Sequence, residues 1–239
     1  MTRVLLTNDD GLEAPGMAAL VDVINSLGWA ATVVAPEEPM SGSSRSRKGD
    51  AELPWRRVSD ATVPTFALRG TPAACVVFGL TSGLVEPVDF CLSGVNAGEN
   101  LGAELSVSGT FGAALEAASF GVPGIALSRQ YGGDIGSDPS SWDWSQVVKH
   151  APSAIEWTTQ QSKWRVANIN LPNSPAINQP VRSRVSDRSY FQNRFSLDEN
   201  RILSTYADLA NLDPRDDIMH FAVENRISVS LFASVHSEL

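Results

Sequence analysis

Short apolar runs alternate with helical patterns along the first 130 residues. The runs 3–7, 31–35, 65–68, 89–92 and 124–128 have the length and apolar content of buried strands. Between them, apolar residues recur at helical spacing or alanine dominates, which predicts helices over 15–28, 72–80 and 108–120. Strands separated by helices of this length require right-handed parallel crossovers. The pattern therefore predicts an α/β protein with a doubly wound, mostly parallel sheet.

The pattern changes after residue 130. A helix is expected over 142–161, although Pro152 should kink it or mark a break. A strand is expected over 165–171, and the apolar end of the chain predicts a final strand over 227–232. Polar and apolar residues alternate through the arginine-rich stretch 181–195, which is typical of an exposed β-ribbon rather than a buried parallel strand.

Composition narrows the class of protein. The 239 residues are 43% hydrophobic and 19% charged, which excludes wholesale disorder. Lys and Arg number 18 against 27 Asp and Glu, and the net charge of −9 argues against nucleic acid or an anionic membrane as the main partner. Cys75 and Cys91, the two cysteines, form neither a disulfide framework nor a zinc motif. With no apolar run of membrane-spanning length, we expect a cytoplasmic protein.

The sharpest motif is Asn8-Asp9-Asp10-Gly11, which directly follows the first predicted strand. Ligands of open α/β sheets bind at the carboxyl ends of strands, and this motif lies at such an end. Two adjacent carboxylates repel each other, so a cation commonly offsets that cost. An Asx turn that leads into the first helix, with no ligand, explains the motif equally well.

Two further loops follow strands of the same sheet. One is Ser41-Gly42-Ser43-Ser44, and the other is the Gly- and Asn-rich stretch 93–102. Each alone could be a solvated turn, but both leave the carboxyl ends of parallel strands and so converge on the rim that carries Asp9 and Asp10. Oxygen ligands from Asp, Asn and Ser suit a hard cation such as Mg²⁺ or Mn²⁺ rather than zinc.

A helix start completes this rim. Ser108-Gly109-Thr110 opens the alanine-rich helix with a hydroxyl cap and several free backbone N–H groups. Such a start favours an anion, commonly phosphate, although Ser108 could be an ordinary N-cap and nothing more. A cation and an anion cradle on one rim indicate phosphoryl chemistry, with water as the nucleophile.

Several motifs match one family in order over residues 3–128. They are LLTNDDGLEAPGMAAL, VVAPEEPMSGSS, LRGTPAACV, LSGVNAGENLG and SVSGTFGAALEA. Together they resemble the SurE (survival protein E) 5′-nucleotidase family, whereas the C-terminal half resembles it only weakly. The resemblance implies a single Rossmann-like domain over 1–239, with a catalytic core over 1–130 and a β-hairpin and C-terminal extension from about 175 to 239. It also implies a divalent-metal-dependent phosphatase that acts on nucleoside 5′- or 3′-monophosphates.

The resemblance also assigns residues. The ligands of the Mg²⁺ or Mn²⁺ ion would be Asp9, Asp10, Ser41 and Asn96. The phosphate would lie among Asn8, Asn96, Ser108, Gly109 and Thr110. The catalytic residues would be Asp9, as a candidate general base for the attacking water, together with Asn8 and Ser108.

Two alternatives to a nucleotidase stay open. Family members usually carry aspartate at the position of Ala74 and often tyrosine at that of Val107, which leaves room for a nucleotide-binding protein with little turnover. A Mg²⁺-binding receiver-type signalling domain would need a phosphoacceptor aspartate after its third strand, where this chain has Phe-Ala-Leu-Arg-Gly. The expected partners are a small-molecule nucleotide and further copies of this chain, as a dimer or tetramer, because exposed strand edges invite pairing. Neither nucleic acid nor membrane is expected.

Overall fold

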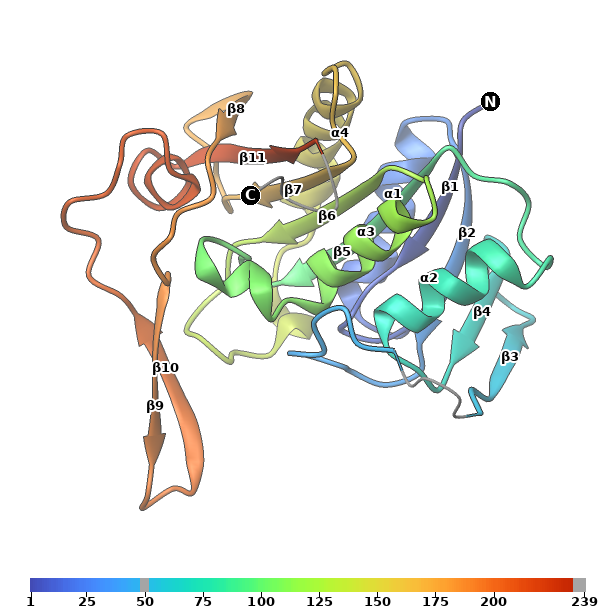
Figure 1. Cartoon of the computed structure of the whole chain (residues 1–239), viewed down its shortest axis with the longest axis horizontal. Helices are drawn as coiled ribbons and strands as arrows, with labels where there is room; N and C mark the ends of the chain where they lie inside the picture. The colour runs from blue at the N-terminus through green and yellow to red at the C-terminus, as the bar shows by residue number, and fades with distance from the viewer. Residues whose placement is uncertain (48–51, 234–239) are drawn as a thin grey trace.

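The computed structural model describes residues 1–47 and 52–233, so the last six residues of the predicted C-terminal extension lie outside the description. These residues contain eleven strands and four α-helices (Figure 1). The strands are β1 (Arg3–Thr7), β2 (Ala30–Pro36), β3 (Trp55–Val58), β4 (Thr65–Leu68), β5 (Phe90–Ala97), β6 (Gly124–Arg129), β7 (Val166–Leu171), β8 (Ile177–Ser183), β9 (Phe191–Ser196), β10 (Arg201–Tyr206) and β11 (Arg226–Phe232). The α-helices are α1 (Pro15–Ser26), α2 (Pro72–Thr81), α3 (Gly109–Ser119) and α4 (Ser145–Thr159), with short helices η1 (Ala103–Ser106), η2 (Pro139–Ser141) and η3 (Met219–Val223).

Nine strands form one sheet in the order β3-β4-β2-β1-β5-β6-β7-β11-β8. The six central strands from β4 to β7 run parallel, while β3 and β11 pair antiparallel with their neighbours β4 and β7. From β1 the chain proceeds outward to β2 and β4, then returns to β5 on the other side of β1 and proceeds outward to β6 and β7. The predicted α/β fold with a doubly wound, mostly parallel sheet is confirmed. Its topological switch point lies between β1 and β5, where such sheets bind ligands.

Helices cover both faces of this sheet. Helices α1 and α4 pack together on one face, and α2 and α3 on the other (Figure 1). Helix α1 begins at Pro15, which pre-sets the helical backbone, and it buries Met17, Leu20 and Ile24 against the sheet. On the first face, side chains of α1, α4 and the sheet form one large apolar cluster. This close packing gives a rigid support to the rim formed by the carboxyl ends of the strands. Cys75 and Cys91 are both buried on the second face and unbonded.

One prediction for the C-terminal half is wrong. The ribbon expected over 181–195 is divided, because β8 joins the main sheet beside β11 while the exposed hairpin consists of β9 and β10. This hairpin extends away from the body of the molecule (Figure 1). Of the two outcomes expected at Pro152, a kink or a break, the break does not occur, because α4 continues through the proline and Val147, Ala151 and Ile155 anchor it in the core on both sides. In residues 1–47 and 52–233, no helix combines the length and apolar character needed to cross a bilayer.

Candidate functional site

Asp9 lies at the centre of the rim, two residues beyond the end of β1. Its side chain is 5% exposed, and its Oδ1 accepts a hydrogen bond of 2.6 Å from the Thr110 hydroxyl at the start of α3. Burial, and then the neighbouring charge of Asp10, raises the pKa of Asp9 to about 7. A carboxylate in this position is unstable without a compensating positive charge. The structure thus brings together the first-strand motif and the helix start that the sequence placed on one rim.

Asp10 connects the turn after β1 to the end of β5, the two strands on either side of the switch point. Its Oδ2 accepts the backbone N–H of Ala97, at the end of β5, over 2.9 Å. Burial raises its pKa as well, although the Ala97 hydrogen bond opposes that shift. Asn96 precedes Ala97, and its Nδ2 donates to the carbonyl of Gly98 over 2.7 Å. Because the nitrogen of the Asn96 amide is engaged in this way, its Oδ1 is free to act as an oxygen ligand.

Helix α3 starts almost in contact with Asp9. A Cβ atom added to Gly109 would lie 2.8 Å from Asp9 Oδ2 and 2.6 Å from Ser43 Oγ, so only glycine permits this approach. Ser108 caps the helix, because its Oγ accepts the N–H of Phe111 over 3.0 Å. The N–H groups of Gly109 and Thr110 have no acceptor within the helix, as is usual in a first turn. An anion at this helix start would therefore lie beside Asp9.

Hydrogen bonds hold the serine loop after β2 at two places, on one side to the turn after β1 and on the other to the segment before α3. The N–H of Met40 donates to the carbonyl of Asp9 over 2.7 Å, which places exposed Ser41 one residue from this contact. Ser44 bonds through its N–H to the Val107 carbonyl (3.2 Å) and through its hydroxyl to the Ser106 carbonyl (3.0 Å). Further along, the fully buried Glu116 carboxylate of α3 binds two arginines of this segment, Arg45 at 2.7 Å and Arg47 at 2.5 Å.

Several polar atoms on this rim are buried without a hydrogen-bond partner among the described residues. They include Oγ of Ser43 and Oδ1 of Asn8. Asn8 itself is fully buried, and its Nδ2 donates to the carbonyl of Gly11 over 2.7 Å, which closes the turn after β1. Buried polar atoms are normally satisfied, so the unpaired Ser43 oxygen near Asp9 suits a polar partner such as a ligand or water. Ser43 is not among the site residues predicted from the sequence, although it lies within the predicted serine motif.

These donors fit a hard divalent cation. In residues 1–47 and 52–233, no cluster of three or more His, Cys, Asp or Glu side chains could hold a metal. The rim offers instead two carboxylates and neutral oxygens from Asn and Ser, the donor set that Mg²⁺ and Mn²⁺ accept. Ser43 Oγ, which has no partner among the described residues, and Asp9 Oδ2 both pack against Gly109, so the two oxygens lie on the same side of the helix start.

The Gly- and Asn-rich loop after β5 is held from behind by asparagines of β7. Asn100 donates its N–H to Asn170 Oδ1 over 2.8 Å, and its carbonyl accepts Nδ2 of both Asn168 and Asn170 at 2.9 Å. The neighbouring Glu99 is 3% exposed, and its Oε2 accepts the N–H of Tyr131 over 2.9 Å. Burial raises the pKa of Glu99 to about 7. Sequence analysis did not single out this buried acid.

Comparisons with known proteins connect this rim to one family. The family model described as "Survival protein SurE" matches residues 4–192. The protein named 5′-nucleotidase SurE of Beijerinckia indica is 40% identical over 178 residues, which are 73% of this chain and 66% of that protein. The 5′-nucleotidase SurE of Brucella anthropi is 36% identical over 202 residues, which are 83% of this chain and 76% of that protein.

A solved structure gives the same result. The crystal structure of the SurE protein from Aquifex aeolicus superposes with a TM-score of 0.77 at 26% identity, covering 98% of this chain and 94% of that one. The matched part of the sequence includes Asp9, Asp10, Asn96 and the start of α3. The resemblance found in the motifs is therefore confirmed, and the chain belongs to the survival protein SurE family.

Proposed function

We propose that this chain is a divalent-metal-dependent phosphomonoesterase that hydrolyses nucleoside 5′- or 3′-monophosphates to nucleoside and phosphate. Relatives that carry the name 5′-nucleotidase support an enzyme of the phosphatase class. The observation that carries the proposal is the contact between Asp9 and the start of α3. Asp9 Oδ1 binds Thr110 while Asp9 Oδ2 faces Gly109, so a cation on the carboxylate and an anion at the helix start would be immediate neighbours.

Each group of the rim has a proposed task. Asp9, Asp10, Ser41 and Asn96 would hold the Mg²⁺ or Mn²⁺ ion. When bound, such an ion polarises a phosphoryl oxygen and lowers the pKa of a bound water. The N–H groups of Gly109 and Thr110 would bind the non-bridging oxygens of the phosphate. Ser108 positions this turn through its cap, and Asn8 positions Asp9 and Asp10 by closing the turn at Gly11.

Asp9 is also the proposed general base. A pKa of about 7 belongs to the carboxyl group without a cation, and a bound Mg²⁺ or Mn²⁺ would lower it and keep Asp9 as a carboxylate that can accept a proton. Thr110 donates to Oδ1 and so orients the carboxyl group, which leaves Oδ2 on the side of Gly109. A water molecule bound to this carboxylate at the open side of the rim would lie beside a phosphate at the helix start. The remaining features of the sequence prediction, a dimer or tetramer in the cytoplasm that binds neither nucleic acid nor membrane, stay predictions.

The test is phosphate release from a panel of nucleoside 5′- and 3′-monophosphates, measured with Mn²⁺, with Mg²⁺ and with a chelator. We expect turnover of monophosphates that depends on the added ion and exceeds that of any phosphodiester. Faster turnover of a dinucleotide than of every monophosphate would contradict the proposal. Tight nucleotide binding without measurable phosphate release would instead favour the nucleotide-binding alternative.

A further inference from the structure

A pocket of about 250 Å³ opens beside Asp10, on the side away from α3. It lies between the start of α1, the serine loop after β2 and the segment around η2. The residues that shape it include Asp10, Ala14, Gly16, Pro39, Ser140 and Trp144. Because Asp10 belongs to both, the pocket and the proposed metal site are continuous.

The indole of Trp144 forms a rigid wall of this pocket. Its Nε1 donates to the carbonyl of Pro139 over 3.0 Å, and its ring stacks on Trp142 with centroids 6.1 Å apart and planes at 19°. The Arg129 guanidinium lies 5.0 Å from both ring centroids. The edge of the Trp144 ring reaches α1, where a Cβ added to Gly16 would lie 3.1 Å from Cη2. The aromatic surface is thus fixed before any ligand arrives.

The charges around the pocket favour a neutral occupant. Two carboxylates border it, Asp10 and Asp138. Both oxygens of Asp138 are engaged by Ser140, through its N–H at 2.9 Å and its hydroxyl at 2.7 Å, and these bonds lower the pKa of Asp138. Asp138 therefore stays ionised at neutral pH, and it repels an anionic group such as phosphate. A flat, uncharged and aromatic group suits these walls.

We propose that this pocket binds the base of a nucleoside monophosphate whose phosphate lies at the start of α3. The inference rests on the proposed function, since it adds a position for the leaving group to the phosphate site. Bases stack on aromatic side chains with little regard to sequence, and Trp144 offers such a surface. At about 250 Å³ the pocket is smaller than the ~300–1,000 Å³ typical of drug-sized ligands, so it has room for one base and not for a dinucleotide.

The chain offers a matched pair of variants for the test. Ser140 and Ser141 are adjacent exposed residues of η2, and each donates its hydroxyl to Asp138, to Oδ2 at 2.7 Å and to the carbonyl at 2.8 Å respectively. Only Ser140 lines the pocket. Ser140→Trp should fill the pocket, whereas Ser141→Trp makes the same chemical change just outside it.

Two substrates separate the base from the phosphate, namely AMP and ribose 5-phosphate, which lacks a base. In Ser140→Trp we expect the KM for AMP to rise at least tenfold more than the KM for ribose 5-phosphate, a difference of about 1.4 kcal/mol. In Ser141→Trp we expect neither KM to change more than twofold. An equal rise for both substrates, or no rise for AMP in Ser140→Trp, would overturn the base pocket.

Direct binding keeps this test separate from the proposed function. Calorimetry of adenosine with the Mn²⁺-loaded protein requires no turnover, and we expect Ser140→Trp to weaken binding at least tenfold relative to Ser141→Trp. A protein that binds adenosine with this pattern but releases no phosphate from AMP would refute the enzyme and retain the pocket. Equal adenosine affinity in the two variants, or no binding in either, would refute the pocket, even in an active phosphatase.

Discussion

The rim of the sheet and the β9–β10 hairpin depart from ordinary packing in opposite directions. On the rim a carboxylate is buried, since Asp9 is 5% exposed. On the hairpin apolar side chains are exposed, since Phe195 and Ile202 are 56% and 67% exposed and pair directly across the two strands. Both arrangements cost free energy in the isolated chain. Under the proposed function a cation would complete the rim, and in the predicted homo-oligomer a protein surface would cover the hairpin.

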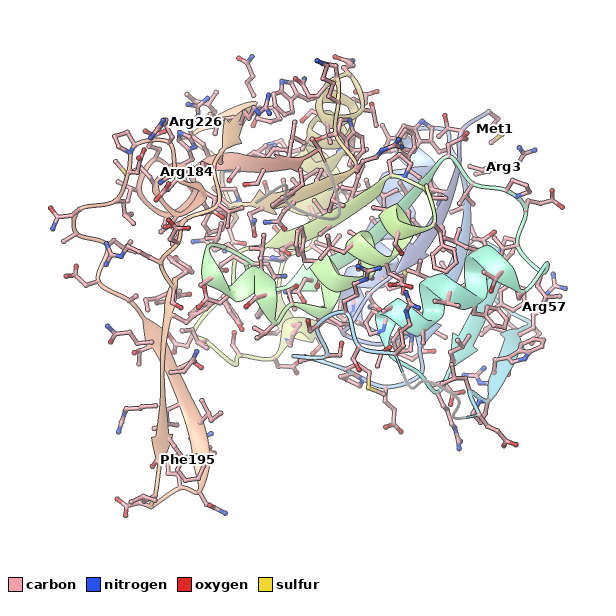
Figure 2. All side chains as sticks on the ribbon, viewed as in Figure 1. Met1, Arg3, Arg57, Arg184, Phe195 and Arg226 are labelled. Atoms are coloured by element: carbon pink, nitrogen blue, oxygen red, sulfur yellow. The ribbon has the colours of Figure 1, made fainter. Side chains whose placement is uncertain are left out.

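The two faces of the hairpin differ in character. Phe195 and Ile202 share one face with Phe191 and Tyr206, whose ring centroids are 5.6 Å apart. Arg194 lies on the opposite face, paired with Leu203. Figure 2 shows Phe195 near the far end of the hairpin, clear of the main body. The hairpin is thus amphipathic, and its face with Phe195 and Ile202 is the one that would contact another copy of the chain in the predicted homo-oligomer.

The largest effect is expected on the rim, from Asp10→Asn. Asparagine keeps the shape of the side chain and can still accept the Ala97 N–H, but it removes one of the two charged ligands of the proposed metal site. We expect Mn²⁺-dependent phosphate release to fall at least about a hundredfold, because losing the ion removes several kcal/mol of transition-state stabilisation. The melting temperature of the metal-free protein should hold or rise, since repulsion with Asp9 is relieved.

Thermal unfolding and phosphate release, both measured on the Asp10→Asn protein, distinguish a metal ligand at Asp10 from a residue that only stabilises the turn. An active but destabilised variant would mean that Asp10 only closes a turn, and the rim would then need no external partner.

The next largest effect is expected where the two regions meet. Asp217 is fully buried near the base of the hairpin, and its carboxylate accepts the N–H groups of Gly102 (3.0 Å), Ser186 (3.0 Å) and Ile218 (2.9 Å). We expect Asp217→Ala to lower the free energy of unfolding by about 3 kcal/mol, because three buried donors lose a charged acceptor. Urea unfolding measures the change, with exposed Asp198→Ala in the hairpin turn as the control. Similar losses in both variants would refute this buried anchor.

A smaller, pH-dependent effect is expected at Glu99. Burial raises the pKa of Glu99 from 4.5 to about 7, so the folded protein retains a proton that the unfolded chain releases. The resulting stabilisation is complete below about pH 4.5 and is lost as pH rises through about 7. Glu99→Gln has no such loss, so at pH 8 it should be more stable than the parent by an amount on the order of 2 kcal/mol.

Urea unfolding of the parent and of Glu99→Gln at pH 5, 6, 7 and 8 tests the Glu99 prediction. Free energies of unfolding that run parallel across this range would show that Glu99 does not titrate there.

The smallest effect on stability is expected from the double variant Phe195→Ser and Ile202→Ser. Each side chain is exposed in the chain itself, so each change should alter the monomer's free energy of unfolding by no more than about 0.5 kcal/mol. The mass from light scattering should nevertheless fall to that of one chain, while Arg194→Gln on the opposite face leaves it unchanged. A parent protein that already scatters as a single chain would contradict the comparison at its hairpin end.

The parallel half of the fold could be predicted because its strands are short apolar runs bounded by helices. The prediction placed β1 and β4 at their observed bounds, and α1 and α2 within two residues of theirs. The hairpin was shifted in sequence because β8 alternates much as β9 does, and only its pairing with β11 distinguishes it. Strand β3 was missed because its sequence, Trp-Arg-Arg-Val, has no apolar run and lies at the sheet edge.

The convergence of Asp9, Asp10 and Thr110 could be predicted from the topology, since the carboxyl ends of parallel strands share one rim. The orientation of the individual serine side chains could not be predicted in this way. In the loop after β2, Gly42 and Ser44 adopt positive φ values of 73° and 51°, which turn the chain in a way that no apolar pattern records. The pocket beside Asp10 was also beyond prediction, because the helix predicted over 142–161 included Trp144, which in the structure precedes α4 and lines the pocket.

The two buried cysteines give this chain a practical advantage. Burial raises the pKa of both Cys75 and Cys91 far above neutral, so neither thiol forms the thiolate that alkylating reagents attack. The native protein should therefore take up no maleimide. A cysteine introduced at exposed Leu197, in the hairpin turn, would carry a single fluorophore without any need to remove the natural thiols. Energy transfer between two such labels would then report directly how far apart hairpins lie in an assembly.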